Sequence, residues 1–161
     1  MFWRLIKTAI FTVVVPGTVA IYMPQTLRGR VATVHASRAV SSGASLALFF
    51  CGAIIYLWCA CDFAVKGLGT PAPIDAPRVL VVKGLYRFTR NPMYVGVAAM
   101  IAGQAGYYRS ASIGIYLLIV LLAFHTFVRL YEEPALRRLF GEQYEVYCRT
   151  VPRWLPRLPH A

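Results

Sequence analysis

The stretch GLYRFTRNPMYVG places several polar side chains directly before a long apolar run. Arg87, Arg90 and Asn91 offer hydrogen-bond donors that could hold a carboxylate or a phosphate. Tyr86 and Tyr94 add hydroxyls and aromatic faces at spacings that could converge on one ligand. A structural interpretation competes with this one, because basic residues anchor the ends of membrane spans and asparagine is a common helix N-cap. The stretch is therefore a candidate binding site or a candidate anchor.

A pair of carboxylates, Glu132 and Glu133, follows another apolar run. The chain has only six acidic residues, and a buried acidic pair could bind a cationic ligand. Alternatively, the two residues cap a helix that begins near Pro134, because acidic groups stabilise the positive end of a helix dipole. Both interpretations stay open.

His125 lies inside an apolar run, and Asp62 lies at the end of one. An ionisable residue within a membrane span is a functional candidate, although a neutral histidine can also bond a neighbouring helix. The four cysteines form no C-x-x-C pair, so the sequence predicts neither a metal site nor a disulfide framework. Buried thiols that act as small apolar groups are the simpler interpretation.

Composition indicates that membrane-spanning helices position these residues. The chain is 58% hydrophobic and 14% charged, whereas about a quarter of a soluble domain is charged. Four uncharged or nearly uncharged windows approach the roughly 20 residues that cross a bilayer. They are approximately 8–27, 39–61, 91–108 and 110–130.

We therefore expect one all-α domain over 1–161, a polytopic membrane protein with about four transmembrane helices. Strands are disfavoured because lipid leaves open sheet edges unsatisfied. A cleavable signal peptide over residues 1–20 is the rival explanation of the first window. In the third window, small residues that include Ala99, Gly103 and Gly106 predict close packing against another helix.

The distribution of charge predicts the topology. Most of the 17 lysines and arginines lie near the N-terminus, in the loop 62–90 or in the tail 131–161. The positive-inside rule then places both termini in the cytoplasm; in a bacterium, the membrane would be the inner membrane. Topology and anionic lipid account for the net charge of +11, so we expect no nucleic-acid partner.

The tail is expected to be helical. Pro134 suits the first turn of a short amphipathic helix, and Gly141 suits its end. The segment EQYEVYCR shows helical spacing of its aromatic residues, and three prolines then stop regular structure. We expect this tail to fold back over the cytoplasmic ends of the spans.

The two motifs GLYRFTRNPMYVG and YEEPALRRLFGEQYEVYCRTVPRW together resemble the isoprenylcysteine carboxyl methyltransferase and phospholipid methyltransferase family. Members are integral membrane enzymes that use S-adenosyl-L-methionine, and the resemblance covers roughly residues 67–156. It implies a helical membrane fold in which a C-terminal cytoplasmic helical tail closes a cofactor pocket. The expected reaction is methyl transfer to a lipid-borne acceptor, with bilayer lipid or a lipidated molecule as partner.

The resemblance also implies roles for individual residues. Glu132 would hold the ammonium group of the cofactor's methionine portion. Together with Tyr86, which the first motif itself suggests, the expected cofactor-binding residues are Arg90, Asn91, Pro92, Tyr94, Gly96, Glu132, Tyr144 and Tyr147. The expected catalytic residues are Glu133 as a possible base, with His125 as the alternative, and Arg87 and Arg138 as groups that orient a carboxylate or phosphate.

The acceptor is left open by the motifs. Asn91 stands where the carboxyl methyltransferases usually have histidine, which favours the phospholipid N-methyltransferases, whereas VPRW favours the carboxyl branch. The acceptor is thus a prenylcysteine-type carboxylate or a phospholipid amine. The alternatives are a methyltransferase of another hydrophobic small molecule and a non-enzymatic membrane scaffold.

Overall fold

The structure is a computed structural model that describes residues 14, 16–28, 38–65 and 80–156. Its regular elements within these ranges are helical, as expected. In chain order they are the π-helical turn η1 (Thr18–Tyr22), α2 (Met23–Leu27), α3 (Arg38–Val65), the 3-10 turn η2 (Gly84–Arg87), α4 (Pro92–Tyr108), α5 (Ala111–Phe127), the π-helical turn η3 (Val128–Glu132), α6 (Glu133–Phe140) and α7 (Glu142–Thr150).

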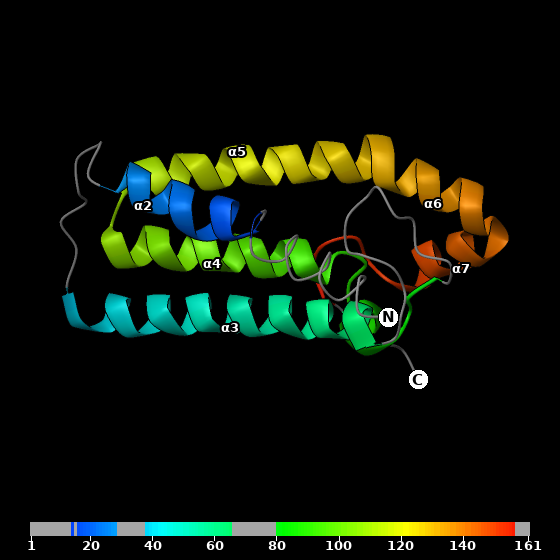
Figure 1. Ribbon diagram of the computed structural model, residues 1–161, viewed down its shortest axis with the longest axis horizontal. Coiled ribbons are helices and arrows are strands. Elements are labelled where there is room, and N and C mark those ends of the chain that lie inside the picture. Colours follow the sequence, from blue (N-terminus) through cyan, green and yellow to red (C-terminus); the bar gives the residue numbers. More distant parts are fainter. Residues whose placement is uncertain (1–13, 15, 29–37, 66–79, 157–161) are drawn as a thin grey trace.

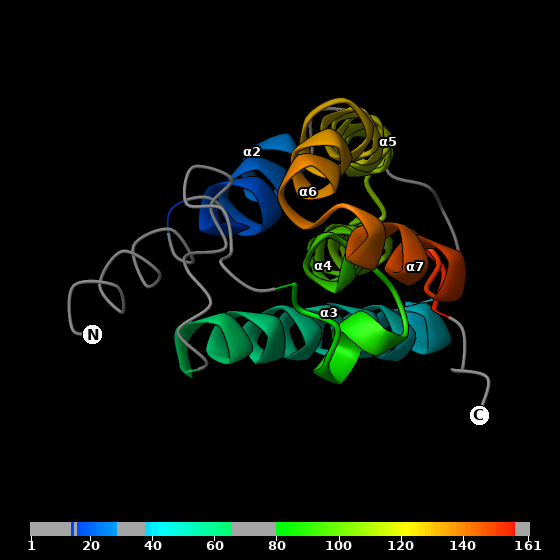
Figure 2. The ribbon, with the colours of Figure 1, turned by 90° about the vertical axis from the view of Figure 1, so that its right-hand side faces the viewer.

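Three long helices, α3, α4 and α5, lie side by side, with α4 between the other two (Figure 1). They alternate in direction, so the end of α3, the start of α4 and the end of α5 meet at one end of the molecule. At the opposite end, α2 packs against α4 and α5. Viewed end-on, α7 lies across the end of α4, between α3 and α6 (Figure 2).

Glycines allow α3 and α4 to pack with their backbones in close contact. A Cβ atom added at Gly52 would lie 2.5 Å from the carbonyl oxygen of Gly96, and one added at Gly103 would lie 2.6 Å from that of Ser45. The Cβ atom of Ala99 on α4 would lie 3.0 Å from the Cβ atom added at Gly52. Small residues permit such contacts between helices in lipid, so the predicted close packing of this window is confirmed.

Two described segments, Ser42–Asp62 and Ala111–Phe140, are long and apolar enough to cross a membrane. Only 22% and 17% of their apolar windows are buried, so most of each surface faces outward, as lipid-facing helices do. The predicted third span forms α4, which has 17 residues. The predicted first span lies only partly within the described residues, so four spans are not shown. The predicted signal-peptide region, residues 1–20, also lies largely outside the described residues.

The helix α5 continues through η3 into α6 without a break. Phe127, Val128 and Glu133 all keep right-handed helical backbone angles, and the N–H of Glu133 donates to the carbonyl of Val128. The first turn of α6 therefore has no free helix end for Glu132 and Glu133 to cap, and that interpretation is wrong. As predicted, a proline occupies the first turn of α6, and Gly141 ends the helix with a φ of +51°.

Candidate functional site

The two sequence motifs meet at the end of the molecule where α4 begins. The turn η2 and the start of α4 lie against η3, α6, α7 and the segment 151–156. We call the segment 151–156 the tail strap. Residues that are some forty to sixty positions apart in the sequence thereby become neighbours. We call this region the motif corner.

Glu133 is held by two arginines in the motif corner. The Arg153 guanidinium donates from Nε to Glu133 Oε1 at 2.6 Å and from Nη2 to Oε2 at 3.0 Å. Arg90 Nη1 donates to Oε1 at 3.1 Å. The Glu133 side chain is only 4% exposed, and a buried carboxylate needs such partners to stay charged. The hydrogen bond to Glu133 raises the pKa of Arg153, so this pair remains ionised.

The tail strap is tied to the residues just before α4. The Arg90 backbone N–H donates to the carbonyl of Pro152 at 2.9 Å. The Thr89 hydroxyl and the Asn91 side-chain amide donate to the carbonyl of Arg153 at 3.1 and 3.0 Å. Asn91 occupies the N-cap position of α4, but its side chain makes no capping bond. The interpretation of Asn91 as a plain side-chain cap is therefore wrong, because its amide holds the tail strap instead.

Glu132 has a different environment from its neighbour in the chain. Its Oε2 accepts a hydrogen bond from the Tyr94 hydroxyl at 3.0 Å, and it forms no ion pair with any residue that the structure describes. The Tyr94 ring packs on Phe124, with 4.6 Å between centroids, and meets Trp154 edge-on at 6.4 Å. Aromatic side chains thus surround a carboxylate that no arginine of the described residues neutralises.

Tyrosines from η2 and α7 line the next part of the motif corner. The Tyr147 hydroxyl donates to the backbone carbonyl of Tyr86 at 2.6 Å, and the Tyr86 hydroxyl bonds the thiol of Cys59 on α3. Burial raises the pKa of Tyr86, Tyr144 and Tyr147. These hydroxyls therefore stay neutral at physiological pH and act as hydrogen-bonding groups with aromatic faces.

The remaining predicted site residues lie outside this cluster or have packing contacts. Arg87 is exposed and stacks on the Phe88 ring at 4.8 Å. Arg138 is exposed and makes no hydrogen bond or ion pair within the described residues. Pro92 is the first residue of α4, and Gly96 lies against the α3 backbone. Their proposed roles in binding and catalysis stay predictions.

Three contacts in the motif corner were not anticipated from the sequence. Arg153 pairs with Glu133, Cys148 accepts a hydrogen bond from Arg90 Nη1 at 2.7 Å, and Trp154 Nε1 donates to His125 Nδ1 at 3.3 Å. A signal for the first contact exists, because a buried glutamate requires a basic partner and VPRW supplies one. The other two depend on how the tail folds.

The described groups fit the methionine portion of S-adenosyl-L-methionine, which carries one ammonium and one carboxylate. Glu132 has no ion-pair partner among the described residues, so its carboxylate could accept the ammonium. Arg90 Nε is buried and has no hydrogen-bond partner in the described part of the chain, although a buried donor without a partner is costly. A bound carboxylate would satisfy it.

Comparison with known proteins identifies one family. A family model described as phospholipid methyltransferase matches residues 40–143, which is more than half of the chain. The matched range contains Arg90, Asn91 and the Glu132–Glu133 pair, and it ends before the tail strap. No curated protein and no solved structure matches the chain.

Proposed function

Because the chain belongs to the phospholipid methyltransferase family, we propose that its acceptor is the amino group of a membrane phospholipid. Family membership makes the chain an S-adenosyl-L-methionine-dependent methyltransferase with a lipid acceptor, and its apolar helices make it an integral membrane protein. The choice of an amine is supported by the description of the matched family as phospholipid methyltransferase. It is also supported by Arg153, which donates to both oxygens of Glu133 and is therefore not available to orient an acceptor carboxylate.

When bound, the cofactor would supply a methyl group on a positively charged sulfur. Attack by the amine lone pair would form the N–C bond as the S–C bond breaks, with S-adenosylhomocysteine as the leaving group and the amine proton released to water. Glu132, oriented by the Tyr94 hydroxyl, accepts hydrogen bonds from the cofactor's ammonium in this proposal. Arg90 Nε donates to its carboxylate, and Tyr86, Tyr144 and Tyr147 provide aromatic walls. Orientation of two reactants in one site contributes much of the rate enhancement in such displacements.

Glu133 receives a positioning role in this proposal rather than the role of general base. Its two oxygens accept hydrogen bonds from Arg90 and Arg153, so it has little capacity to take a proton. His125 is also engaged, because its Nδ1 accepts from Trp154. Glu133 instead fixes Arg90 and the tail strap against the start of α4.

We place the motif corner at the cytoplasmic membrane face, with both termini in the cytoplasm. The support is the positive-inside bias of the sequence, together with the fold, which brings the end of α3, the start of α4 and the end of α5 to one side. A water-soluble cofactor and a lipid-borne acceptor can meet only at such an interface.

Methyl transfer can be tested with the full chain in nanodiscs that contain phosphatidylethanolamine and with cofactor that carries a labelled methyl group. The expected result is label in the lipid fraction that stays non-volatile after treatment with base, because base cleaves the acyl esters but not an N-methyl bond. Label that base releases as volatile methanol would indicate a methyl ester and would overturn the amine proposal. Label only in a non-phospholipid molecule, or no binding of S-adenosylhomocysteine, would instead support the small-molecule methyltransferase or the scaffold.

A further inference from the structure

Trp154 in the tail strap contacts two of the long helices at once. Its indole Nε1 donates to His125 Nδ1 on α5 at 3.3 Å, and the centroids of the two rings are 6.3 Å apart. The same indole meets the Tyr94 ring on α4 at 6.4 Å, with 62° between the planes. Its backbone carbonyl accepts a hydrogen bond from the Thr89 hydroxyl at 3.1 Å. Both the backbone and the ring of Trp154 are therefore held in place.

The bond to His125 also defines the protonation of that imidazole. Nδ1 can accept from the indole only while it carries no proton, so the single proton of the neutral ring lies on Nε2. An imidazolium has donors at both nitrogens and could not accept this bond. His125 thus anchors the polar edge of the indole to α5, while another part of the indole contacts Tyr94.

Tyr94 transmits this restraint to Glu132. Its ring contacts Phe124 at 4.6 Å and Trp154 at 6.4 Å, and its hydroxyl donates to Glu132 Oε2 at 3.0 Å. Because partners from α5 and the tail strap already restrict the Tyr94 side chain, ligand binding does not have to order it. The direction of the Glu132 carboxylate therefore depends, through one ring and one hydroxyl, on a residue of the tail strap.

We propose that Trp154 is a positioning residue for the site of the cofactor's ammonium, because it holds Tyr94 so that Glu132 stays directed at that group. The inference rests on the proposed function, which gives Glu132 this ligand. Trp154 lies outside the range 40–143 that matches the family model, so the assignment comes from the contacts of this chain. The tail strap then contributes to cofactor affinity as well as to the stability of the motif corner.

Calorimetric titration of the detergent-purified full chain with two ligands tests this role. S-adenosylhomocysteine carries the ammonium, whereas 5′-methylthioadenosine has the same nucleoside but lacks the ammonium and the carboxylate. Trp154→Leu should weaken S-adenosylhomocysteine binding roughly three- to tenfold, the effect of one lost aromatic pair. It should leave the affinity for 5′-methylthioadenosine unchanged, because that ligand has no group for Glu132.

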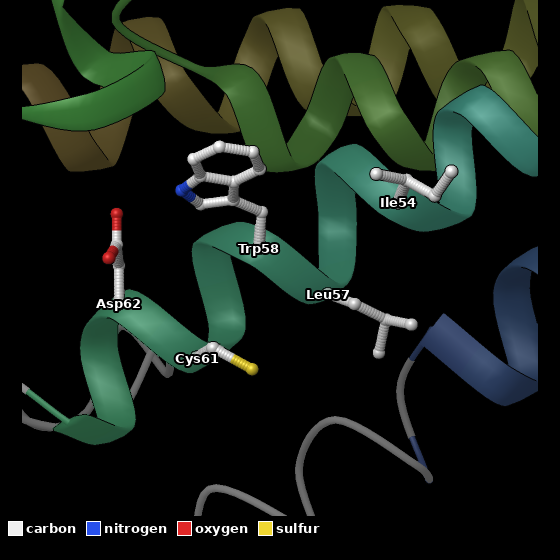
Figure 3. A pocket seen from close by; sticks show the side chains of 5 residues that line it. All are labelled: Ile54, Leu57, Trp58, Cys61 and Asp62. Carbon is white, nitrogen blue, oxygen red and sulfur yellow. The ribbon is translucent and has the colours of Figure 1, made fainter.

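The matched control is Trp58→Leu, since Trp58 is 56% exposed and lines an open pocket on α3 (Figure 3). This variant should bind both ligands like the wild type. A double substitution, Trp154→Leu with Glu132→Gln, separates a positioning role from a structural one. If Trp154 acts through Glu132, Trp154→Leu should cause no further loss of S-adenosylhomocysteine affinity once the charge is gone. A purely structural role would cause the same loss in both backgrounds.

Three outcomes would overturn the proposal. They are an unchanged S-adenosylhomocysteine affinity in Trp154→Leu, an equal loss for the two ligands, and an additive loss in the Glu132→Gln background. Because Trp154→Leu could displace the tail strap, Trp154→Phe provides a milder variant that keeps a ring beside Tyr94. Its loss should be smaller than that of Trp154→Leu and again confined to S-adenosylhomocysteine, and a loss that extended to 5′-methylthioadenosine would contradict the positioning role.

Methyl transfer separates this inference from the proposed function. Transfer to phospholipid together with an unaltered S-adenosylhomocysteine affinity in Trp154→Leu would retain the function and refute the positioning role. A selective loss of that affinity in Trp154→Leu, with a wild type that transfers no methyl group to phospholipid, would retain the positioning role and refute the function.

Discussion

Glu132 and Glu133 are adjacent in the chain, yet they have different partners. Glu133 is buried and bound by Arg153 and Arg90, whereas Glu132 accepts one hydrogen bond from a tyrosine. We therefore propose a structural role for Glu133 and a binding role for Glu132. The two residues should therefore respond differently to the same isosteric substitution.

Glu132→Gln should weaken S-adenosylhomocysteine binding by about 10- to 100-fold, the effect of losing a charge-assisted hydrogen bond. The substitution preserves shape and the acceptor for Tyr94 but removes the charge that attracts the ammonium. Calorimetric titration of detergent-purified protein measures the change. Glu142→Gln serves as the control and should bind like the wild type. An unchanged affinity in Glu132→Gln would contradict the assignment of this carboxylate.

Glu133→Gln should mainly reduce stability. Breaking a buried ion pair from one side costs about 3–5 kcal/mol of unfolding free energy, because it leaves the buried Arg90 without its counter-charge. Glu145→Gln breaks the exposed pair with Arg137 and should cost no more than about 1 kcal/mol. Thermal unfolding in detergent compares the two variants. Equal losses would show that Glu133 is not the anchor of the tail strap.

At the residue scale, the sequence predicted part of the motif corner but not how its side chains pair, and the predicted site residues Arg87 and Arg138 are exposed instead. Arg90, Asn91, Tyr94 and Glu132 all come together, because the motifs and the apolar windows determine which helix ends meet. The pairing of Glu133 with Arg153 depends on the path of the tail after Pro152. No local pattern in the sequence encodes that path.

At the scale of elements, the contact between α3 and α4 depends on the absence of side chains at a few positions. Gly52→Ala would place a methyl group 2.5 Å from a backbone oxygen of α4, where no flexible side chain can move aside. Overpacking of this kind costs about 1–3 kcal/mol, so we expect a lower unfolding temperature.

Gly114→Ala is the matched control for this substitution. Gly114 also lies within a helix, α5, and nothing lies within 4 Å of a Cβ atom added there. The substitution should be neutral or stabilise the protein by up to about 1 kcal/mol, because alanine favours helix. If both variants unfolded at the same temperature, the close contact between α3 and α4 would not govern stability.

Helix boundaries were predictable where local chemistry decides them. Pro92 begins α4 and Gly141 ends α6, because proline suits a first turn and glycine tolerates a positive φ. The helix α3 continues to Val65, beyond the predicted end at Cys61. The π-helical turn η3 was not predicted, since its sequence is also compatible with an ordinary α-helix.

At the scale of the whole molecule, the helices bring the described residues of the motif corner together at one end. Arg28 marks the opposite end, where its guanidinium lies 5.3 Å from the centre of the Tyr108 ring. Hydropathy predicted the helical fold and two of the four expected spans, Ser42–Asp62 and Ala111–Phe140, since both follow from composition and length. The order of the helices, with α4 in the centre, follows from packing that composition does not reveal.

The topology can be checked with a membrane-impermeant maleimide on intact cells and on inverted vesicles. A cysteine introduced as Glu142→Cys should react only from the cytoplasmic side, and one introduced as Arg28→Cys only from the opposite side. Labelling of the unsubstituted chain provides the background from its own thiols. Reaction of both introduced cysteines from the same side would exclude the proposed orientation.

The π-helical turn η3 has a consequence for the spacing of the motif itself. A π turn contains one residue more than the same stretch of α-helix. Removal of a single residue from 128–131 would therefore leave an ordinary α-helical turn, with Glu133 still directed toward Arg90 and Arg153. Removal of a residue from the α-helical part of α5 would instead rotate all that follows by about 100° around the axis, so related chains that share the site should differ in length by one residue at η3 more readily than within α5.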